Sequence, residues 1–185
     1  HGTDPADPSK YGIPGGGWLG NRSTKNLPQV FGDYSGNADK RAMFGPGNLE
    51  ISNVLTFTDG IGVYKFSNLT STGEQPYSPN GVLCSTDFPL FRLAEMYLTY
   101  IEAVKRGGTG GDDPTALQYF NMLRERGYEN TDGDVTSYSL NDILNERQRE
   151  LYWEGFRRTD LIRFGEFTGS NYLWPWKGGV QGGTG

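Results

Sequence analysis

Two glutamates in the segment 145–167, Glu150 and Glu154, have the residue type and spacing that could support acid–base chemistry. Residues four apart on a helix lie on the same face, so both carboxylates would project from adjacent turns. Paired carboxylates hydrolyse glycosidic bonds when one is a protonated acid and the other an ionised base or nucleophile. A glycoside hydrolase is therefore one interpretation of this segment.

The arginines of the same segment argue against that chemistry. Its basic residues are Arg147, Arg149, Arg157, Arg158 and Arg163, and its acidic residues are equally numerous. Cations close to a carboxylate lower its pKa, whereas a general acid needs a raised pKa. We therefore favour a structural role for the two glutamates over a catalytic one.

A helix over residues 140–154 would turn part of this charge toward its packing side. At about 100° per residue, the apolar stripe consists of Leu140, Ile143, Leu144 and Leu151. Arg147 lies in the middle of that stripe, Glu154 at its edge and Glu150 just beyond it. The residues predicted to face away are Asn145, Gln148, Arg149 and Tyr152.

Charges on a packing side must be paired, because an unpaired buried charge costs several kcal/mol. Arg147 could reach Glu150 three residues later, whereas Glu150 and Glu154 repel each other unless further cations approach them. The predicted network contains Arg147, Glu150, Glu154, Arg157, Arg158, Arg163 and, from an upstream helix, Arg92. We interpret it as a guanidinium–carboxylate network that locks helices together.

Helical periodicity and cap residues predict the elements around this network. The first helix runs from about residue 89 to Gly107, and the second is capped by Asp113 with Pro114 at its first position. The third begins after Ser139, and a short fourth covers 157–164. The first two resemble a tetratricopeptide-type hairpin, which cannot bury its own face and normally stacks on neighbours.

The region before these helices is rich in Pro, Gly and Asp and is predicted to be mostly irregular. A short helix is predicted over 38–44. The β-branched and aromatic run 49–69 is split by Asp59-Gly60, which predicts a β-hairpin. The fold class is therefore mainly α with irregular loops and a short β-hairpin. We expect a loop-rich region (1–86), a helical region (87–167) and a Gly/Trp-rich tail (168–185), all part of one larger domain whose ends are cut.

Composition limits the partners and cofactors. The net charge of −5 argues against nucleic acid, which attracts basic surfaces. No apolar run is long enough to span a membrane. His1 and Cys84 cannot make a zinc site, and no other cofactor is expected. Calcium at Asn130, Asp132 and Asp134 stays open, although Val135 occupies the position where a calcium loop needs Gly.

Three helical segments resemble the C-terminal part of SusD/RagB-type proteins. They are FPLFRLAEMYLTYIEAV, ALQYFNMLRERG and LNERQRELYWEGFRRTDLIRFGEF, and WLGNRSTKNLPQVFGDYSGNADKRAMF, GVYKFSN and YLWPWKGGV also match. The resemblance implies a non-catalytic lipoprotein of the outer membrane at the bacterial cell surface, whose lipid anchor lies outside this chain. It implies capture of oligosaccharides for a SusC-like TonB-dependent transporter, and the starch-type branch looks closest.

Sugar binding needs flat aromatic faces and planar polar groups, and Gly-rich loops can present both. The carbohydrate-binding candidates are Trp18, Asn21, Arg22, Tyr11, Tyr34 and Tyr77. Each of the aromatic residues has packing in the protein interior as its alternative. Two other functions stay open, namely a module that docks the transporter without touching sugar, and the glycoside hydrolase.

Overall fold

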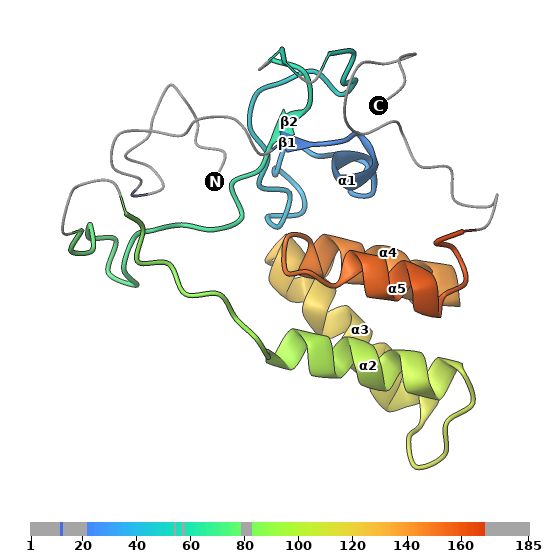
Figure 1. Cartoon of the computed structure of the whole chain (residues 1–185). Coiled ribbons are helices and arrows are strands. Elements are labelled where there is room, and N and C mark those ends of the chain that lie inside the picture. The colour runs from blue at the N-terminus through green and yellow to red at the C-terminus, as the bar shows by residue number, and fades with distance from the viewer. Residues whose placement is uncertain (1–11, 13–21, 54, 57, 79–82, 169–185) are drawn as a thin grey trace. The chain divides into compact units, whose positions relative to one another are not determined.

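The computed structural model describes residues 12, 22–53, 55–56, 58–78 and 83–168 (Figure 1). Internal contacts divide the chain into two compact units. The first unit comprises His1–Gln29, Met43–Phe88 and Trp174–Gly185, and the second comprises Val30–Ala42 and Pro89–Leu173. The second unit is discontinuous in sequence, because a loop from the N-terminal part of the chain belongs to the same unit as the helices.

The second unit contains helices α2 (Leu93–Lys105), α3 (Asp113–Tyr128), α4 (Leu140–Leu151) and α5 (Arg157–Arg163). Helix α2 packs against both α3 and α4, and α5 packs against α4 (Figure 1). This arrangement confirms the predicted mainly helical fold. Within the described part of the chain, none of the helices combines the length and the apolar character that crossing a bilayer requires.

The helix starts follow from local capping. Asp112, rather than the predicted Asp113, is the N-cap of α3, and its Oδ1 accepts from the Thr115 amide at 2.8 Å. Ser139 caps α4 as predicted, in a reciprocal capping box with Asp142. These caps fix where α3 and α4 begin and therefore which side chains of α4 face the core.

Two apolar clusters hold the helices together. One consists of Ile101, Ala116, Phe120, Tyr138 and Ile143, and the other of Ala94, Leu98, Leu123 and Leu151. The Phe120 and Tyr138 rings stack with centroids 5.0 Å apart. Since α2, α3 and α4 all contribute to these clusters, the apolar core holds these three helices against one another.

The first unit contains α1 (Asn26–Gln29) and a two-stranded antiparallel sheet of β1 (Arg22–Ser23) and β2 (Ile61–Gly62). The sheet is short, as predicted. The predicted hairpin would pair the residues before Asp59-Gly60 with those after it, whereas in the structure β2 pairs with β1 from upstream. The Asp59 carboxylate accepts from the amides of Ser52 and Asn53, both at 3.0 Å, and so closes a loop. The residues after that loop are left to pair with β1 instead of with residues 49–58.

The predicted helix over 38–44 is wrong. The Asp39 carboxylate accepts from the backbone amide of Arg41 at 3.0 Å, which is a local alternative to helical hydrogen bonding. The Lys40 amide donates at 2.7 Å to the carbonyl of Gly127 in α3. The segment is therefore a turn that is fastened to α3, and it directs Arg41 toward α4.

Candidate functional site

Helix α4 carries several charged side chains into the interior of the second unit. Glu146 is 0% exposed, Arg147 and Glu150 are each 3% exposed, and Glu154, just after the helix, is 6% exposed. Burial on this scale is tolerated only when ionised groups pair and their hydrogen bonds are satisfied. The structure supplies the partners from four other parts of the same unit, namely the loop 30–42, Arg92 before α2, helix α3 and helix α5.

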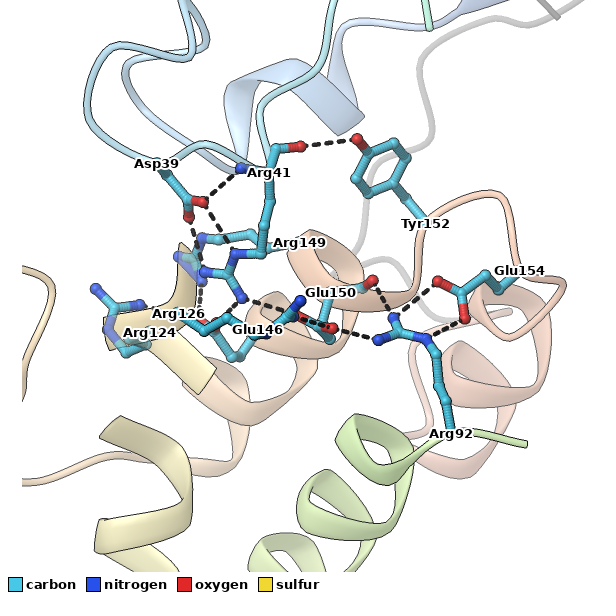
Figure 2. Close-up of polar contacts among 10 residues, drawn as sticks. All are labelled: Asp39, Arg41, Arg92, Arg124, Arg126, Glu146, Arg149, Glu150, Tyr152 and Glu154. Atoms are coloured by element: carbon cyan, nitrogen blue, oxygen red, sulfur yellow. Dashed lines mark hydrogen bonds and ion pairs between the residues drawn. The ribbon is translucent and has the colours of Figure 1, made fainter. Parts of the chain in front are cut away.

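Arg41 is the first centre of this network (Figure 2). Its Nη1 lies 2.6 Å from Glu146 Oε1 and 3.0 Å from Glu150 Oε2. Its Nε and Nη2 donate to the two carboxylate oxygens of Asp39 at 2.9 and 2.7 Å. The Arg41 carbonyl accepts from the Tyr152 hydroxyl at 2.7 Å. One guanidinium thus contacts three buried carboxylates.

Arg92, at the start of α2, is the second centre. Its Nε and Nη2 donate to the carboxylate of Glu154 at 2.6 and 2.8 Å, as Figure 2 shows. Its Nη1 donates to Glu150 Oε1 at 2.5 Å, and Arg126 of α3 reaches the same oxygen at 2.5 Å. Glu150 therefore accepts from Arg41, Arg92 and Arg126, which come from three separate segments.

Glu146 has a similar set of partners on its other oxygen. Arg124 of α3 and Arg149 of α4 both lie 2.9 Å from Glu146 Oε2. Since Arg41 occupies Oε1, both carboxylate oxygens of this fully buried side chain accept charge-assisted hydrogen bonds. The carboxylate is thereby held in one orientation between the loop 30–42 and α3.

The pKa shifts of Glu150 and Arg41 keep both groups ionised. Burial would raise the pKa of Glu150, but the charges of Arg126, Arg92 and Arg41 outweigh burial and lower that pKa below its ordinary value. Burial would lower the pKa of Arg41, but the carboxylates of Glu146, Asp39 and Glu150 raise it above its ordinary value. A glutamate with a lowered pKa is poorly suited to donate a proton at neutral pH.

Arg147 has a different partner from the predicted Glu150. Its Nε lies 2.9 Å from Asp160 Oδ1 in α5, and Arg163 lies 2.8 Å from the same oxygen. Arg163 also pairs with Glu102 of α2 at 2.8 Å. The predicted pair fails because Glu150 is taken by cations from other segments, while Arg147 points from α4 toward α5.

The remaining predicted network residues have other contacts. Arg157 Nη1 donates to the carbonyl of Leu144 at 2.9 Å, which joins α5 to α4. The guanidinium of the exposed Arg158 lies over the Phe167 ring, 4.9 Å from its centroid. The structure therefore brings Arg92, Glu150 and Glu154 together, and it places Arg147 and Arg163 around Asp160.

The network predicted from the sequence lacked several of its members, namely Asp39, Arg41, Glu102, Arg124, Arg126, Glu146 and Asp160. Gln148 and Tyr152, predicted to face away, are only 8% and 4% exposed. The helical wheel placed one apolar stripe on α4 but could not show that the loop 30–42 covers another face.

The predicted sugar-binding residues are divided over the two units, and the structure does not bring those among the described residues into one group. Tyr34 in the second unit is 38% exposed, and Tyr77 in the first unit is 83% exposed. Arg22 donates to the carbonyls of Thr56 and Asp59 and thereby braces the loop that precedes β2. Tyr11, Trp18 and Asn21 lie outside the described residues. The proposed stacking role of these residues therefore stays a prediction.

The acidic loop after α3 forms an internal turn. Asn130 Oδ1 accepts from the Asp132 amide at 2.8 Å, and Asn130 Nδ2 donates to Asp132 Oδ2 at 3.0 Å. Among the described residues, no group of three or more His, Cys, Asp or Glu side chains is placed to hold a metal ion. These contacts occupy Asn130 Oδ1 and one of the two carboxylate oxygens of Asp132.

We expect acid to destabilise the second unit through Glu150 and Glu102. Burial raises the pKa of Glu102, but hydrogen bonds from Arg163 and Arg106 outweigh it and lower that pKa, as arginines do for Glu150. A group with a lowered folded-state pKa contributes stability above its unfolded pKa, about 4.3 for Glu, and loses it as the pH falls through the folded value. Urea unfolding between about pH 3 and pH 7 should therefore show a falling free energy of unfolding below about pH 5. A free energy that stays constant down to pH 3 would contradict this.

Comparisons with known proteins agree with this architecture. The model of the SusD family matches residues 12–182. The chain is 43% identical over 166 residues to the starch-binding protein SusD of Bacteroides thetaiotaomicron, covering 87% of this chain and 28% of that protein. It is 36% identical over 73 residues to a SusD-like protein of Bacteroides ovatus, covering 40% of this chain and 13% of that protein.

A solved structure shows the same fold. The crystal structure of a SusD superfamily protein from Bacteroides vulgatus matches with a TM-score of 0.59 and 26% identity. The match covers 85% of this chain and 32% of that one, so the chain spans about a third or less of the length of each of these relatives. Since the family model extends over nearly all of the sequence, and the helices that hold the charged network lie within it, this chain belongs to the SusD family.

Proposed function

We propose that the chain is part of a protein that binds oligosaccharides of the starch type and has no catalytic activity. The observation that carries the proposal is the 43% identity to a starch-binding protein over 87% of this chain. Aromatic side chains in loops would supply the stacking surfaces, with Tyr77 as the most exposed described candidate. Trp18, Tyr11, Tyr34, Asn21 and Arg22 complete the proposed set.

The state of the glutamates supports binding without turnover. Glu150 and Glu154 are both held by Arg92, and the pKa of Glu150 is lowered. Glycoside hydrolysis needs one carboxyl group that stays protonated until it donates to the leaving oxygen. A network that keeps a carboxylate ionised and buried serves the architecture of the second unit, and we assign it that role.

We further propose that the full-length protein acts at the outer-membrane surface of the cell, attached through a lipid anchor. There it would deliver captured sugar to a SusC-like TonB-dependent transporter. Support for this assignment comes from membership in the family and from the starch-binding relative. The net charge of −5 is consistent with a sugar or protein partner and unfavourable for nucleic acid.

Native electrophoresis in gels that contain amylopectin tests the proposal. The chain should be retarded relative to a gel without polysaccharide, and Trp18→Ala should weaken the retardation about tenfold or more, because a stacking tryptophan supplies much of the contact with a sugar ring. Phe91→Ala is the matched control, since Phe91 is an aromatic residue that is 84% exposed but lies outside the proposed set.

The alternatives give different results in the same assay. Absence of retardation for the unaltered chain would contradict glycan binding and favour a module that only docks the transporter. Retardation that is unchanged in both Trp18→Ala and Tyr77→Ala would contradict the proposed binding site in the loops. Release of reducing sugar that disappears in Glu150→Gln would contradict the non-catalytic assignment.

A further inference from the structure

Helices α2 and α3 leave an apolar face of the second unit open to solvent. Leu93 of α2 is 62% exposed and Met122 of α3 is 40% exposed, although both are large apolar side chains. A groove of about 380 Å³ lies along this face, and its apolar lining consists of Leu93, Ala94, Tyr97, Met122 and Leu123. Exposed apolar surface that continues into a groove is typical of an interaction site.

The side chains on this face follow helical spacing. Leu93 and Tyr97 lie four residues apart on α2, and Tyr119 and Met122 lie three apart on α3, so each pair shares one face of its helix. The Tyr97 and Tyr119 rings stack with centroids 4.3 Å apart and join the two pairs. Other faces of both helices are packed in the apolar core together with α4. The hairpin therefore has a second apolar face, which the described residues leave uncovered.

A helix is the element that fits this face. Side chains three and four residues apart form ridges, and a third helix can pack its own ridges into the groove between two such rows. An extended peptide would instead need an unpaired sheet edge, which a pair of helices does not offer. We therefore expect an amphipathic helix whose apolar side chains have the same spacing.

The length of the relatives indicates where that helix comes from. The chain spans 28% of the starch-binding protein SusD and 32% of the solved superfamily protein, so most of each relative lies outside the matched part. A helix in the same polypeptide has a high effective concentration at this face. It can cover the apolar groove permanently, whereas a separate partner would expose the groove whenever it dissociates. An intramolecular helix is therefore favoured over a second protein.

Two arginines in the groove lining set the charge of that helix. Arg92 and Arg126 lie at the end of the hairpin where α2 begins and α3 ends. Arg92 donates to Glu150 and Glu154 through all its guanidinium nitrogens. Arg126 donates to Glu150 through Nη2, its side chain is 58% exposed, and within the described residues its other nitrogens have no acceptor. A carboxylate on the docked helix would pair with Arg126.

We propose that an amphipathic helix from a part of the full-length polypeptide outside these 185 residues covers this face. Its apolar side chains pack against Leu93, Tyr97 and Met122, and one of its carboxylates pairs with Arg126. The docked helix extends the hairpin of α2 and α3 into a layer of three helices. The inference concerns how the full-length protein is assembled, and it holds whether or not the chain binds glycans.

Maleimide labelling of a cysteine in the groove tests the proposal. Met122→Cys is compared in the 185-residue chain and in the full-length protein, after the native cysteines, Cys84 among them, have been replaced by Ser. Ser137→Cys, at an exposed position between α3 and α4, is the matched control and gives the reference rate in each protein. The rate for Met122→Cys relative to Ser137→Cys should be at least tenfold lower in the full-length protein, because the docked helix shields the thiol.

Two further variants test the apolar and the ionic contact separately. Leu93→Glu should leave the urea midpoint of the 185-residue chain nearly unchanged, because this side chain is 62% exposed there, but it should lower the midpoint of the full-length protein. Arg126→Gln should raise the relative labelling rate of Met122→Cys in the full-length protein about twofold to fivefold, as expected for the loss of one partly exposed ion pair.

Each alternative gives a different result. Equal relative rates in the two proteins would mean that no helix covers the face. Slow labelling of the 185-residue chain that quickens on dilution would assign the face to a second copy, and slow labelling at every dilution would assign it to another part of the same chain. Protection that appears only when bacterial membranes are added would assign it to a separate partner. An unchanged rate in Arg126→Gln would overturn the carboxylate contact.

Discussion

Arg41→Met is expected to lower the free energy of unfolding by about 3–5 kcal/mol, the usual cost of removing one partner from a buried charge cluster. Methionine retains most of the side-chain volume but leaves Asp39, Glu146 and Glu150 without their shared cation. Glu146 is fully buried, and Asp39 is 1% exposed, so neither can be resolvated without opening the structure. Urea unfolding followed by circular dichroism at pH 7 measures the loss.

Arg126→Met is the matched control for this experiment. Arg126 also pairs with Glu150, at 2.5 Å, but its side chain is 58% exposed. Exposed ion pairs contribute about 0–1 kcal/mol, so the expected loss is several times smaller than for Arg41→Met. Equal losses for the two variants would show that burial does not determine the energetics of this network.

Gly127→Ala is expected to destabilise the chain, although alanine inside a helix is normally more stable than glycine by about 0.5–1 kcal/mol. A Cβ at this position would lie 2.4 Å from Arg41 Nε and 2.9 Å from Asp39 Oδ1. The Arg41 side chain cannot move aside, because carboxylates hold its Nε and both terminal nitrogens. Overpacking of this kind costs about 1–3 kcal/mol, which exceeds the helical gain.

The double variant Arg41→Met/Gly127→Ala separates this clash from other effects of the alanine. The methionine side chain is flexible and lacks the hydrogen bonds that fix the guanidinium. The cost of Gly127→Ala should therefore shrink in the Arg41→Met background, and the two changes should be non-additive by about 0.5–3 kcal/mol. Strict additivity in thermal or urea unfolding would mean that the two residues do not interact.

The helical part of the fold was accessible from sequence because its signals are local. Ser139 caps α4 as predicted, Pro114 lies in the first turn of α3, and α2 ends just before Gly107. The irregular regions were less predictable. The run 49–69 has strand composition, yet Asp59 uses its carboxylate to close a loop, and the strand that follows pairs with Arg22–Ser23 far upstream.

The charged network was predictable in kind but not in its connections. Helical geometry showed that Glu150 and Glu154 would be near the packing side, and Arg92 was correctly placed beside both. Helical geometry could not show that Arg41 pairs with Glu146 and Glu150, which lie 105 and 109 residues later in the sequence. Contacts of that range depend on how a loop docks, and no periodicity within α4 encodes them.

The dependence of α4 on Arg41 has a consequence for dissecting the protein. A truncated polypeptide that begins at Pro89 would contain every helix from α2 to α5, and its secondary-structure signals would be intact. It would lack Val30–Ala42, however, and with that loop the cation shared by Glu146 and Glu150. The smallest autonomous piece of the second unit must therefore join two separated stretches of sequence, for example by circular permutation or by co-expression of the missing loop.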